Sequence, residues 1–477
     1  MKLTRQAFLR TYLPILLFFI AFFSKLFFIN TRDICLDEPF TIYHAQFSVG
    51  DILKLPSQNE PNPPLFMLLL HFWIKLFGIS STSVRFLPLL FNAFTVVFIY
   101  LTGKKFFNFW VGVLASCIFI FSTYHFYFGL EARTYSLLSM AIAASMYYFL
   151  SLIQNSENRK ILAFLLIANL ILVYSHYFGW YVIFIQFLTG FLYIKNNWIF
   201  KVSILAVVLT GVLYLPMMPT LFKQFFISSK GTWLEAPSHS EYLNQLYWFL
   251  NGRLGFGITV LIFCAGVVYA ILKKGLEKID KEIVIIFLWW FVPFTTTFLV
   301  SFKMPMFTNR YVLFNSIGLY LFIAVLINYL YPRKLSYIVG VLLISAFFTQ
   351  LQINSKDFYY REVKNLVNKA KSETTDDSVI LIYPYWADLG FMYYYDRDIF
   401  MAYDKYDSQL ASKNIYHVWG LEEAQEKVKK FQDKRIIYIQ DGQLGDHQIY
   451  NYLDSTFLKT DNLFYPQCFQ IAIFEPQ

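Results

Sequence analysis

The chain has 477 residues, of which 57% are hydrophobic and 21% aromatic, whereas only 15% are charged. In soluble domains roughly a quarter of all residues are charged, so this composition excludes an ordinary water-soluble protein with a single hydrophobic core. The net charge of +9 does not indicate a nucleic-acid partner, because the basic residues form short clusters between apolar blocks. Those blocks are roughly 18 to 22 residues long, which suffices to cross about 30 Å of hydrocarbon. We therefore predict a polytopic α-helical membrane protein.

The apolar blocks predict about eleven transmembrane helices. Basic residues such as Lys104-Lys105 and Arg333-Lys334 lie in the connections on one side, which the positive-inside rule assigns to the cytoplasm. With an odd number of spans, the N-terminus is inside and the C-terminal part outside. The predicted helices cover residues 11–29, 84–101, 109–128, 133–153, 161–175, 177–194, 202–219, 255–272, 283–300, 311–330 and 337–354.

The first outer loop, residues 30–83, contains a further apolar segment from Asn62 to Gly78. Pro63-Pro64 interrupts it and His71 and Lys75 make it too polar for a span. A helix lying at the membrane interface fits better. The side chains expected to face lipid are Phe66, Leu69, Leu70, Trp73 and Phe77.

The composition changes near residue 355, so we expect a transmembrane domain over 1–354 and an extracytoplasmic α/β domain over 355–477. Such a domain is large enough to have its own core. Helical patterns cover 362–371, 421–431 and 446–453, and strand patterns cover 379–383, 399–403, 415–419 and 436–440.

Asp37-Glu38 is an acidic pair that follows the first predicted helix by a few residues, near the membrane surface. An ionised carboxylate there can accept a proton from an attacking hydroxyl. An isolated acidic dipeptide is more often a solvated loop charge, so its surroundings decide between these readings.

Further polar groups occur at the predicted outer ends of helices. Taken singly, each has an ordinary explanation as a snorkelling cation, a boundary tyrosine or a structural histidine. Together, acids and cations at one bilayer face suit transfer from a donor that carries a phosphate. Glu131 and Tyr135 would share a helix face if the fourth span begins early enough. These groups are Glu131, Arg133, Tyr135, His176, Lys303, Arg310 and Tyr311.

Several spaced motifs in order make the sequence recognisable. They are Asp37-Glu-Pro-Phe-Thr, Asn62-Pro-Pro-Leu-Phe-Met, Leu76-Phe-Gly, Val84-Arg-Phe-Leu-Pro, Glu131-Ala-Arg-Thr-Tyr, Tyr174-Ser-His-Tyr-Phe-Gly and Asn309-Arg-Tyr. Over about residues 8–330, the chain resembles bacterial members of the protein O-mannosyltransferase and aminoarabinose transferase superfamily, which are GT-C-type integral membrane glycosyltransferases.

The resemblance implies a sugar donor on a polyprenyl phosphate and an active site at the outer face of a bacterial cytoplasmic membrane. Asp37 matches the position of the general base, with Glu38 beside it, and Glu131 matches a second acidic position. Arg133, Lys303 and Arg310, with Tyr311 next to it, would then face the donor phosphate. The expected reaction moves a single sugar to a glycan, lipid or protein acceptor with inversion at the anomeric carbon.

A divalent metal is not a firm expectation, because the requirement differs among relatives. Relatives often have His-Pro-Pro where this chain has Asn62-Pro63-Pro64, which removes a candidate ligand or proton carrier. His176 with a carboxylate and another histidine could still form a zinc site. The other histidines considered are His44, His71 and His125.

Two other classes of function compete with a single-sugar transferase. A flippase or transporter of lipid-linked saccharides would place polar groups near the bilayer midplane, whereas these spans are nearly free of mid-helix charge. An oligosaccharide ligase or polymerase shares the topology and the donor type, and only product analysis separates it. Asp396-Arg-Asp398 matches a metal motif of nucleotide-sugar enzymes, but three-residue matches recur by chance.

Overall fold

A computed structural model describes residues 5–58, 60–232, 234–274, 280–353, 362–441, 445–465 and 469–477. The chain divides into two compact units, which we describe separately. Unit 1 comprises residues 1–28, 50–69 and 85–353, and unit 2 comprises residues 29–49, 70–84 and 354–477.

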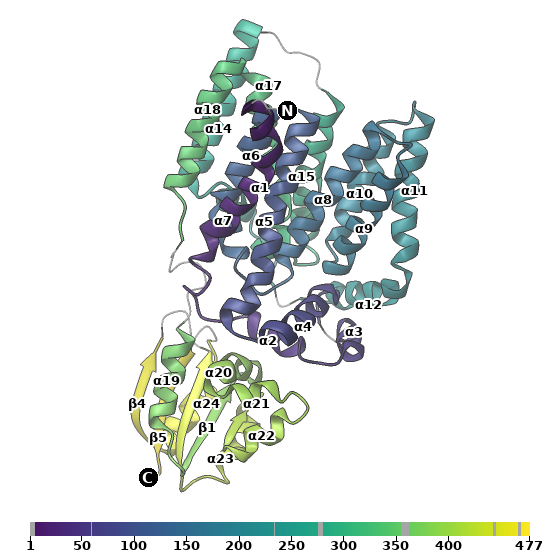
Figure 1. Cartoon of the computed structure of the whole chain (residues 1–477). Helices are drawn as coiled ribbons and strands as arrows, with labels where there is room; N and C mark the ends of the chain where they lie inside the picture. Colours follow the sequence, from purple (N-terminus) through teal and green to yellow (C-terminus); the bar gives the residue numbers. More distant parts are fainter. Residues whose placement is uncertain are drawn as a thin grey trace. The chain divides into compact units, whose positions relative to one another are not determined.

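Unit 1 is a bundle of helices (Figure 1). Each of the eleven predicted ranges overlaps a helix, because long apolar blocks satisfy their backbone groups within one segment. The long helices are α1 (Arg5–Leu26), α5 (Ser81–Phe106), α6 (Phe109–Ile120), α8 (Tyr135–Gln154), α9 (Arg159–Ser175), α10 (Gly179–Phe191), α11 (Asn197–Leu213), α14 (Arg253–Tyr269), α15 (Lys281–Val300), α17 (Asn315–Leu330) and α18 (Arg333–Thr349).

Fewer helices than predicted are long enough to cross a bilayer by themselves. Within the described part of the chain, four helices meet that length and hydropathy, or five if one bent pair counts as a single span. The other helices, such as α10 and α17, are apolar but shorter. The predicted count of about eleven spans therefore stays a prediction.

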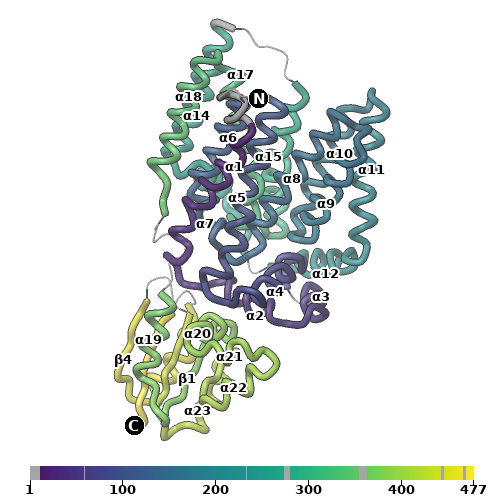
Figure 2. Tube along the Cα trace, viewed as in Figure 1, coloured from purple at the N-terminus to yellow at the C-terminus, as the bar shows by residue number. Residues whose placement is uncertain are grey.

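A bend divides the predicted helix 202–219. Helix α11 ends at Leu213, and Leu215–Ser229, which comprises η1 (Leu215–Met217) and α12 (Met218–Ser229), continues at an angle of 52° to it. Pro216 lies at the break, where proline lacks a backbone N–H and ends the regular ladder. The bend turns α12 toward α3 (Val49–Gln58), which the Figure 2 trace also shows.

Uncharged polar side chains join helices α8 to α11 inside the bundle. Asn169 Nδ2 donates to Gln186 Oε1 over 3.0 Å and to Thr210 Oγ1 over 3.2 Å. The Ser145 hydroxyl donates to Asn169 Oδ1 over 2.6 Å. Such bonds hold apolar helices together where lipid gives no hydrophobic driving force.

The apolar segment of the first outer loop forms helix α4 (Leu65–Phe77), but its exposed face differs from the prediction. Phe66 and Leu70 are buried, so they do not face lipid. Phe72 and Leu76 are 56% and 76% exposed, and Leu69 and Phe77 lie on the same face. The error follows from choosing apolar residues by type, because nearly every position of this helix is apolar.

Unit 2 contains a five-stranded sheet in the order β2-β1-β3-β5-β4. The first three strands are parallel, and β5 and β4 add antiparallel. Helices α23 (Leu421–Val428) and α24 (Gln448–Thr456) cover an apolar core that includes Tyr438 and Phe474. The strands are β1 (Ser378–Tyr383), β2 (Ile415–His417), β3 (Arg435–Asp441), β4 (Leu458–Phe464) and β5 (Phe469–Glu475).

Three of the four predicted strands and the three predicted helices of this region are present, the first helix being α19 (Val363–Glu373). The predicted strand 399–403 is wrong, because helix α21 (Arg397–Met401) occupies that position. Asp396 caps this helix by accepting bonds from the backbone N–H groups of Asp398 and Ile399. Strands β4 and β5 were not predicted, and the residues of β4 are mostly polar and exposed.

Candidate functional site

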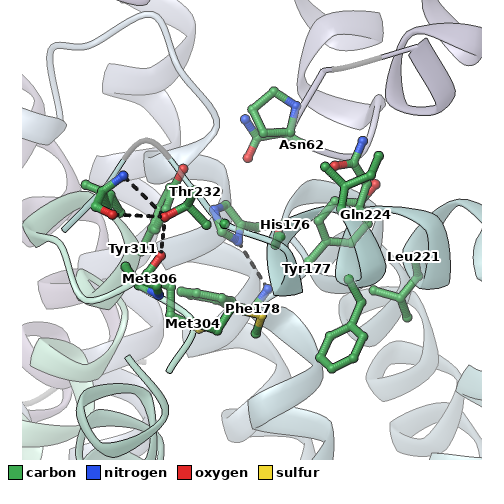
Figure 3. A pocket seen from close by; sticks show the side chains of 17 residues that line it. Asn62, His176, Tyr177, Phe178, Leu221, Gln224, Thr232, Met304, Met306 and Tyr311 are labelled. Carbon is green, nitrogen blue, oxygen red and sulfur yellow. Dashed lines mark hydrogen bonds between the residues drawn. The ribbon is translucent and has the colours of Figure 1, made fainter. Parts of the chain in front are cut away.

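A pocket of about 320 Å³ lies in unit 1 and is formed by four separate segments of the chain (Figure 3). Its volume is at the lower end of the roughly 300–1,000 Å³ that is usual for small-molecule sites. Three predicted site residues, Asn62, His176 and Tyr311, line it together. The other lining residues are Pro61, Tyr177, Phe178, Leu221, Gln224, Phe225, Ile227, Ser228, Gly231, Thr232, Leu234, Met304, Pro305 and Met306.

His176 lies in the turn between α9 and α10 and is 4% exposed. Its Nδ1 accepts the backbone N–H of Phe178 over 3.1 Å, so the neutral ring carries its proton on Nε2. Gly179 permits the tight turn, because a Cβ there would lie 2.8 Å from the Leu172 side chain. Burial, and secondarily the nearby Arg133 cation, lowers the pKa of His176 to about 3. The imidazole is therefore neutral at physiological pH.

Asn62 and Gln224 form the opposite side of the pocket. The Asn62 amide donates to Glu60 Oε1 over 3.1 Å. Gln224, on α12, donates from Nε2 to the Pro56 carbonyl over 2.8 Å. Helix α12 thus closes the pocket because the bend at Pro216 directs it across the end of α3.

Two loops complete the lining near Tyr311. The Thr232 hydroxyl donates to the Pro305 carbonyl over 2.8 Å and joins the two loops. The Tyr311 ring lies 5.7 Å from the His176 ring and 5.5 Å from the Phe178 ring, in T-shaped geometries. Aromatic side chains therefore border the imidazole.

The predicted cations are not among the lining residues, but two of them directly precede lining residues in the chain. Lys303 precedes the lining residue Met304, and Arg310 precedes Tyr311 on the short helix α16 (Asn309–Val312). Lys303 is exposed and Arg310 is half-buried. Arg133 is 7% exposed and acts electrostatically on His176.

Glu131 and Arg133 lie in a buried turn, with Glu131 7% exposed. Helix α8 begins at Tyr135, so Glu131 precedes the helix. The expectation that Glu131 and Tyr135 share a helix face is therefore wrong. The Arg133 N–H donates to the Glu131 carbonyl over 2.7 Å, which tightens this turn. Tyr135 packs its ring at 5.3 Å against Phe128.

Asp37 and Glu38 belong to unit 2, at the start of helix α2 (Glu38–His44). Asp37 is the N-cap residue and half-buried, whereas Glu38 is 3% exposed. Leu36 directly before them has a φ of +57°. A branched residue in this left-handed region costs about 1–3 kcal/mol, and such strain tends to occur at functional sites.

The C-terminal region holds the segment that contains this acidic pair. The Ile34 N–H donates to the Tyr394 hydroxyl over 2.5 Å, and Lys364 Nζ lies 3.2 Å from Asp33 Oδ1. Gln46 Nε2 donates to the Phe400 carbonyl over 3.3 Å. These bonds bracket α2 on both sides, and α2 packs against α20 (Asp388–Tyr395).

The histidines considered as zinc ligands do not gather around a carboxylate. Among the described residues, no three His, Cys, Asp or Glu side chains lie close enough to hold a metal ion. His71 donates from Nδ1 to the Ala45 carbonyl over 2.8 Å, and His125 Nε2 is 2.7 Å from the Ser316 hydroxyl. These two rings make structural hydrogen bonds.

The sequence did not single out Glu60, Tyr177, Gln224 or Thr232. Tyr177 directly follows His176, and Glu60 stands two residues before Asn62, so proximity to a motif was the available signal. Gln224 and Thr232 carried no such signal, because they reach the pocket through the bend in the chain.

The chain has a GT-C-type fold. ArnT from Cupriavidus metallidurans in the apo state aligns over 98% of both chains with a TM-score of 0.65 at 10% identity. The same protein bound to undecaprenyl phosphate gives a TM-score of 0.61 at 10% identity, over 97% of both chains. The archaeal oligosaccharyltransferase AglB from Archaeoglobus fulgidus, in complex with an inhibitory peptide and a dolichol-phosphate, gives 0.52 at 8% identity, over 91% of this chain and 70% of AglB.

The sequence model of the dolichyl-phosphate-mannose-protein mannosyltransferase family matches residues 61–222, which include Asn62, Glu131 and His176. This match agrees with the predicted resemblance to the protein O-mannosyltransferase and aminoarabinose transferase superfamily over about a third of the chain. No curated protein sequence matches the chain.

Proposed function

We propose that the chain is a membrane glycosyltransferase that moves a single sugar from a polyprenyl phosphate to an acceptor hydroxyl. One observation carries this proposal: Asn62, His176 and Tyr311, chosen from separate motifs, line one pocket in a GT-C-type fold. Undecaprenyl phosphate binds the similarly folded ArnT, which supports a donor of this class.

In this proposal Arg133, Arg310 and Lys303 bind the donor phosphate. Lys303 and Arg310 directly precede lining residues in the chain and Arg133 acts electrostatically on His176, which supports a phosphate site beside the pocket. Charge develops on the departing polyprenyl phosphate as the glycosidic bond breaks, and cations that bind it more strongly then lower the barrier. No nucleotide-binding loop is required, because the leaving group is a lipid phosphate.

Asp37 is the proposed general base, and Glu38 and Glu131 support the site as further acids. Asp37 would take the proton of the acceptor hydroxyl as its oxygen attacks the anomeric carbon. A single displacement of this kind inverts the configuration at that carbon. The strained Leu36 backbone before the acid pair is consistent with a segment held in place for chemistry.

We further propose the orientation and the domain roles. The N-terminus lies on the cytoplasmic side of a bacterial inner membrane, because the basic loops cluster on that side. Residues 1–354 form the transferase domain, with the acids in outer loop 30–83, and residues 355–477 form an extracytoplasmic domain. The acceptor is a glycan, a lipid or a protein.

A transfer assay tests the proposal. Purified protein is incubated with polyprenyl-phosphate sugars and candidate acceptors, and the products are analysed by mass spectrometry. We expect one sugar to be added and polyprenyl phosphate to be released. A transferred chain of sugars would instead identify a ligase or polymerase. Lipid-linked sugar that crosses vesicle membranes without any product would identify a flippase.

A further inference from the structure

Two buried polar atoms in the pocket have no hydrogen-bond partner among the described residues: His176 Nε2 and the Tyr177 hydroxyl oxygen. His176 is 4% exposed, and both residues line the pocket. Leaving a buried polar group without a partner destabilises the folded chain. Two such groups on residues that line one cavity are available to bond a ligand there.

Both groups are uncharged hydrogen-bonding groups at physiological pH. The His176 ring is neutral, since its pKa lies far below 7, and Nδ1 already accepts a bond, so Nε2–H is a donor. The Tyr177 hydroxyl is also protonated, because a tyrosine ordinarily has a pKa of about 10. The tyrosine hydroxyl can both donate and accept.

The lining itself carries no formal charge. None of its described residues is Asp, Glu, Lys or Arg. The charges that act on the two orphaned groups have opposite signs, with Arg133 near His176 and Glu60 near Tyr177. A phosphate would be repelled at the Glu60 end and an ammonium group at the Arg133 end. The pocket therefore favours a ligand without net charge.

The remaining lining suits a ring with polar edges and apolar faces. Tyr311 and Phe178 present aromatic surface beside His176 (Figure 3). Leu221, Phe225 and Met306 add apolar surface, and the Asn62 and Gln224 amides add polar groups at the opposite side. A monosaccharide combines hydroxyl groups at its edge with apolar C–H faces. The volume of about 320 Å³ limits the ligand to a small molecule.

We propose that this pocket binds the uncharged ring of a monosaccharide, with the His176 Nε2–H group donating to a sugar oxygen and the Tyr177 hydroxyl bonding to a second one. The assignment rests on the proposed function and refines it to neutral hexoses or pentoses. The donor phosphate would remain outside the pocket, among the bordering cations.

Binding of water-soluble glycosides tests the pocket without any lipid donor. Calorimetric titration of the purified full chain would use methyl glycosides of mannose, glucose, galactose and arabinose. A methyl aminoglycoside and a methyl glucuronide, which carry their charge on the sugar ring, are the charged probes. We expect at least one neutral glycoside to bind about tenfold more tightly than either charged probe. Equal or tighter binding of a charged probe would overturn the proposal.

Three variants locate the binding. His176→Phe removes the donor and should weaken binding of the best glycoside about tenfold to hundredfold, because a ligand oxygen then loses its hydrogen bond. His176→Gln keeps an N–H donor, so its affinity for the glycoside should stay within about threefold of the wild-type affinity. Tyr177→Phe removes the hydroxyl group and should weaken glycoside binding about tenfold. The exposed His239→Gln is the matched control and should change nothing.

Unchanged affinity in both His176→Phe and Tyr177→Phe would refute the site. Affinity should also be flat between pH 5 and 8, because neither group titrates there, and a proton-linked change that depends on His176 would contradict the neutral donor. The transfer assay is separate: glycoside binding without transfer would keep the pocket and refute the proposed reaction. Sugar transfer at an unchanged rate in both His176→Phe and Tyr177→Phe would keep the proposed reaction and refute the pocket.

Discussion

The pocket around His176 and the segment around Asp37 treat polar groups in opposite ways. In the pocket, His176 and Tyr177 are neutral, and His176 Nε2 and the Tyr177 hydroxyl have no partner among the residues that the structure describes. The Asp37 segment is instead tied down by Asp33 and Ile34 through hydrogen bonds and an ion pair. The polar atoms at the pocket are thus available to a ligand, whereas the acidic segment is held by bonds to other parts of unit 2.

The largest expected effect concerns the acidic segment. Asp37→Asn should lower the rate of sugar transfer by about 10²–10⁴-fold, because a positioned base contributes that much. The amide keeps the size of the side chain but cannot take a proton. Initial rates with a saturating lipid donor measure the effect. Asp51→Asn, an exposed acid on α3, is the matched control and should keep full activity. Full transfer by Asp37→Asn would remove Asp37 as the base.

A smaller effect is expected for the cations that border the pocket. Arg310→Gln should raise KM for the lipid donor about tenfold to hundredfold, because it removes a charge-assisted bond to phosphate. Arg310→Lys keeps the charge but loses the bidentate geometry, so its KM should lie between those of the wild type and Arg310→Gln. The exposed Arg333→Gln serves as the control and should leave KM unchanged. An unchanged KM in Arg310→Gln would show that phosphate binds elsewhere.

Tyr394→Phe tests whether the C-terminal region positions the acidic pair. The variant removes the acceptor of the Ile34 N–H bond and should lower kcat several-fold, up to about tenfold, with KM for the donor unchanged. Tyr395→Phe is a matched control, because its hydroxyl makes only a 3.5 Å contact with Thr374. A change in KM with constant kcat would contradict a positioning role.

The smallest effect concerns the pair of His417 and Asp388 in unit 2. His417 Nδ1 lies 2.8 Å from Asp388 Oδ2, and the hydrogen bond to Asp388 raises the pKa of His417. A raised folded-state pKa gives stability that is complete below the unfolded pKa of about 6.5 and is lost as pH rises through the folded value.

Hydrogen-exchange protection of strands β1 and β2 should therefore fall as the pH rises from about 6 to 8, after correction for intrinsic exchange. His417→Gln should abolish this pH dependence. Burial also raises the pKa of Asp388, which likewise lowers the stability of the folded state as the pH rises, but in a lower pH range. Protection that increases with pH in the wild type would contradict the assignment.

The sequence by itself determined the helical membrane architecture, the α/β character of the C-terminal part and the set of polar residues at helix ends. Apolar blocks of span length and period-two strands are local signals, so these features follow from short stretches of chain. Glu131, His176 and Arg310 were found because a charged or polar residue is costly inside an apolar block and stands out at its edge.

Only the tertiary structure decided which of these residues meet. Asn62, His176 and Tyr311 are separated by long stretches of chain. They converge because α12 bends at Pro216 and because Gly231, Thr232 and residues 304–306 complete the pocket. The loss of partners at His176 and Tyr177, and the anchoring of the Asp37 segment by Tyr394, also depend on distant segments. Burial and pairing are properties of packing, and no local pattern encodes them.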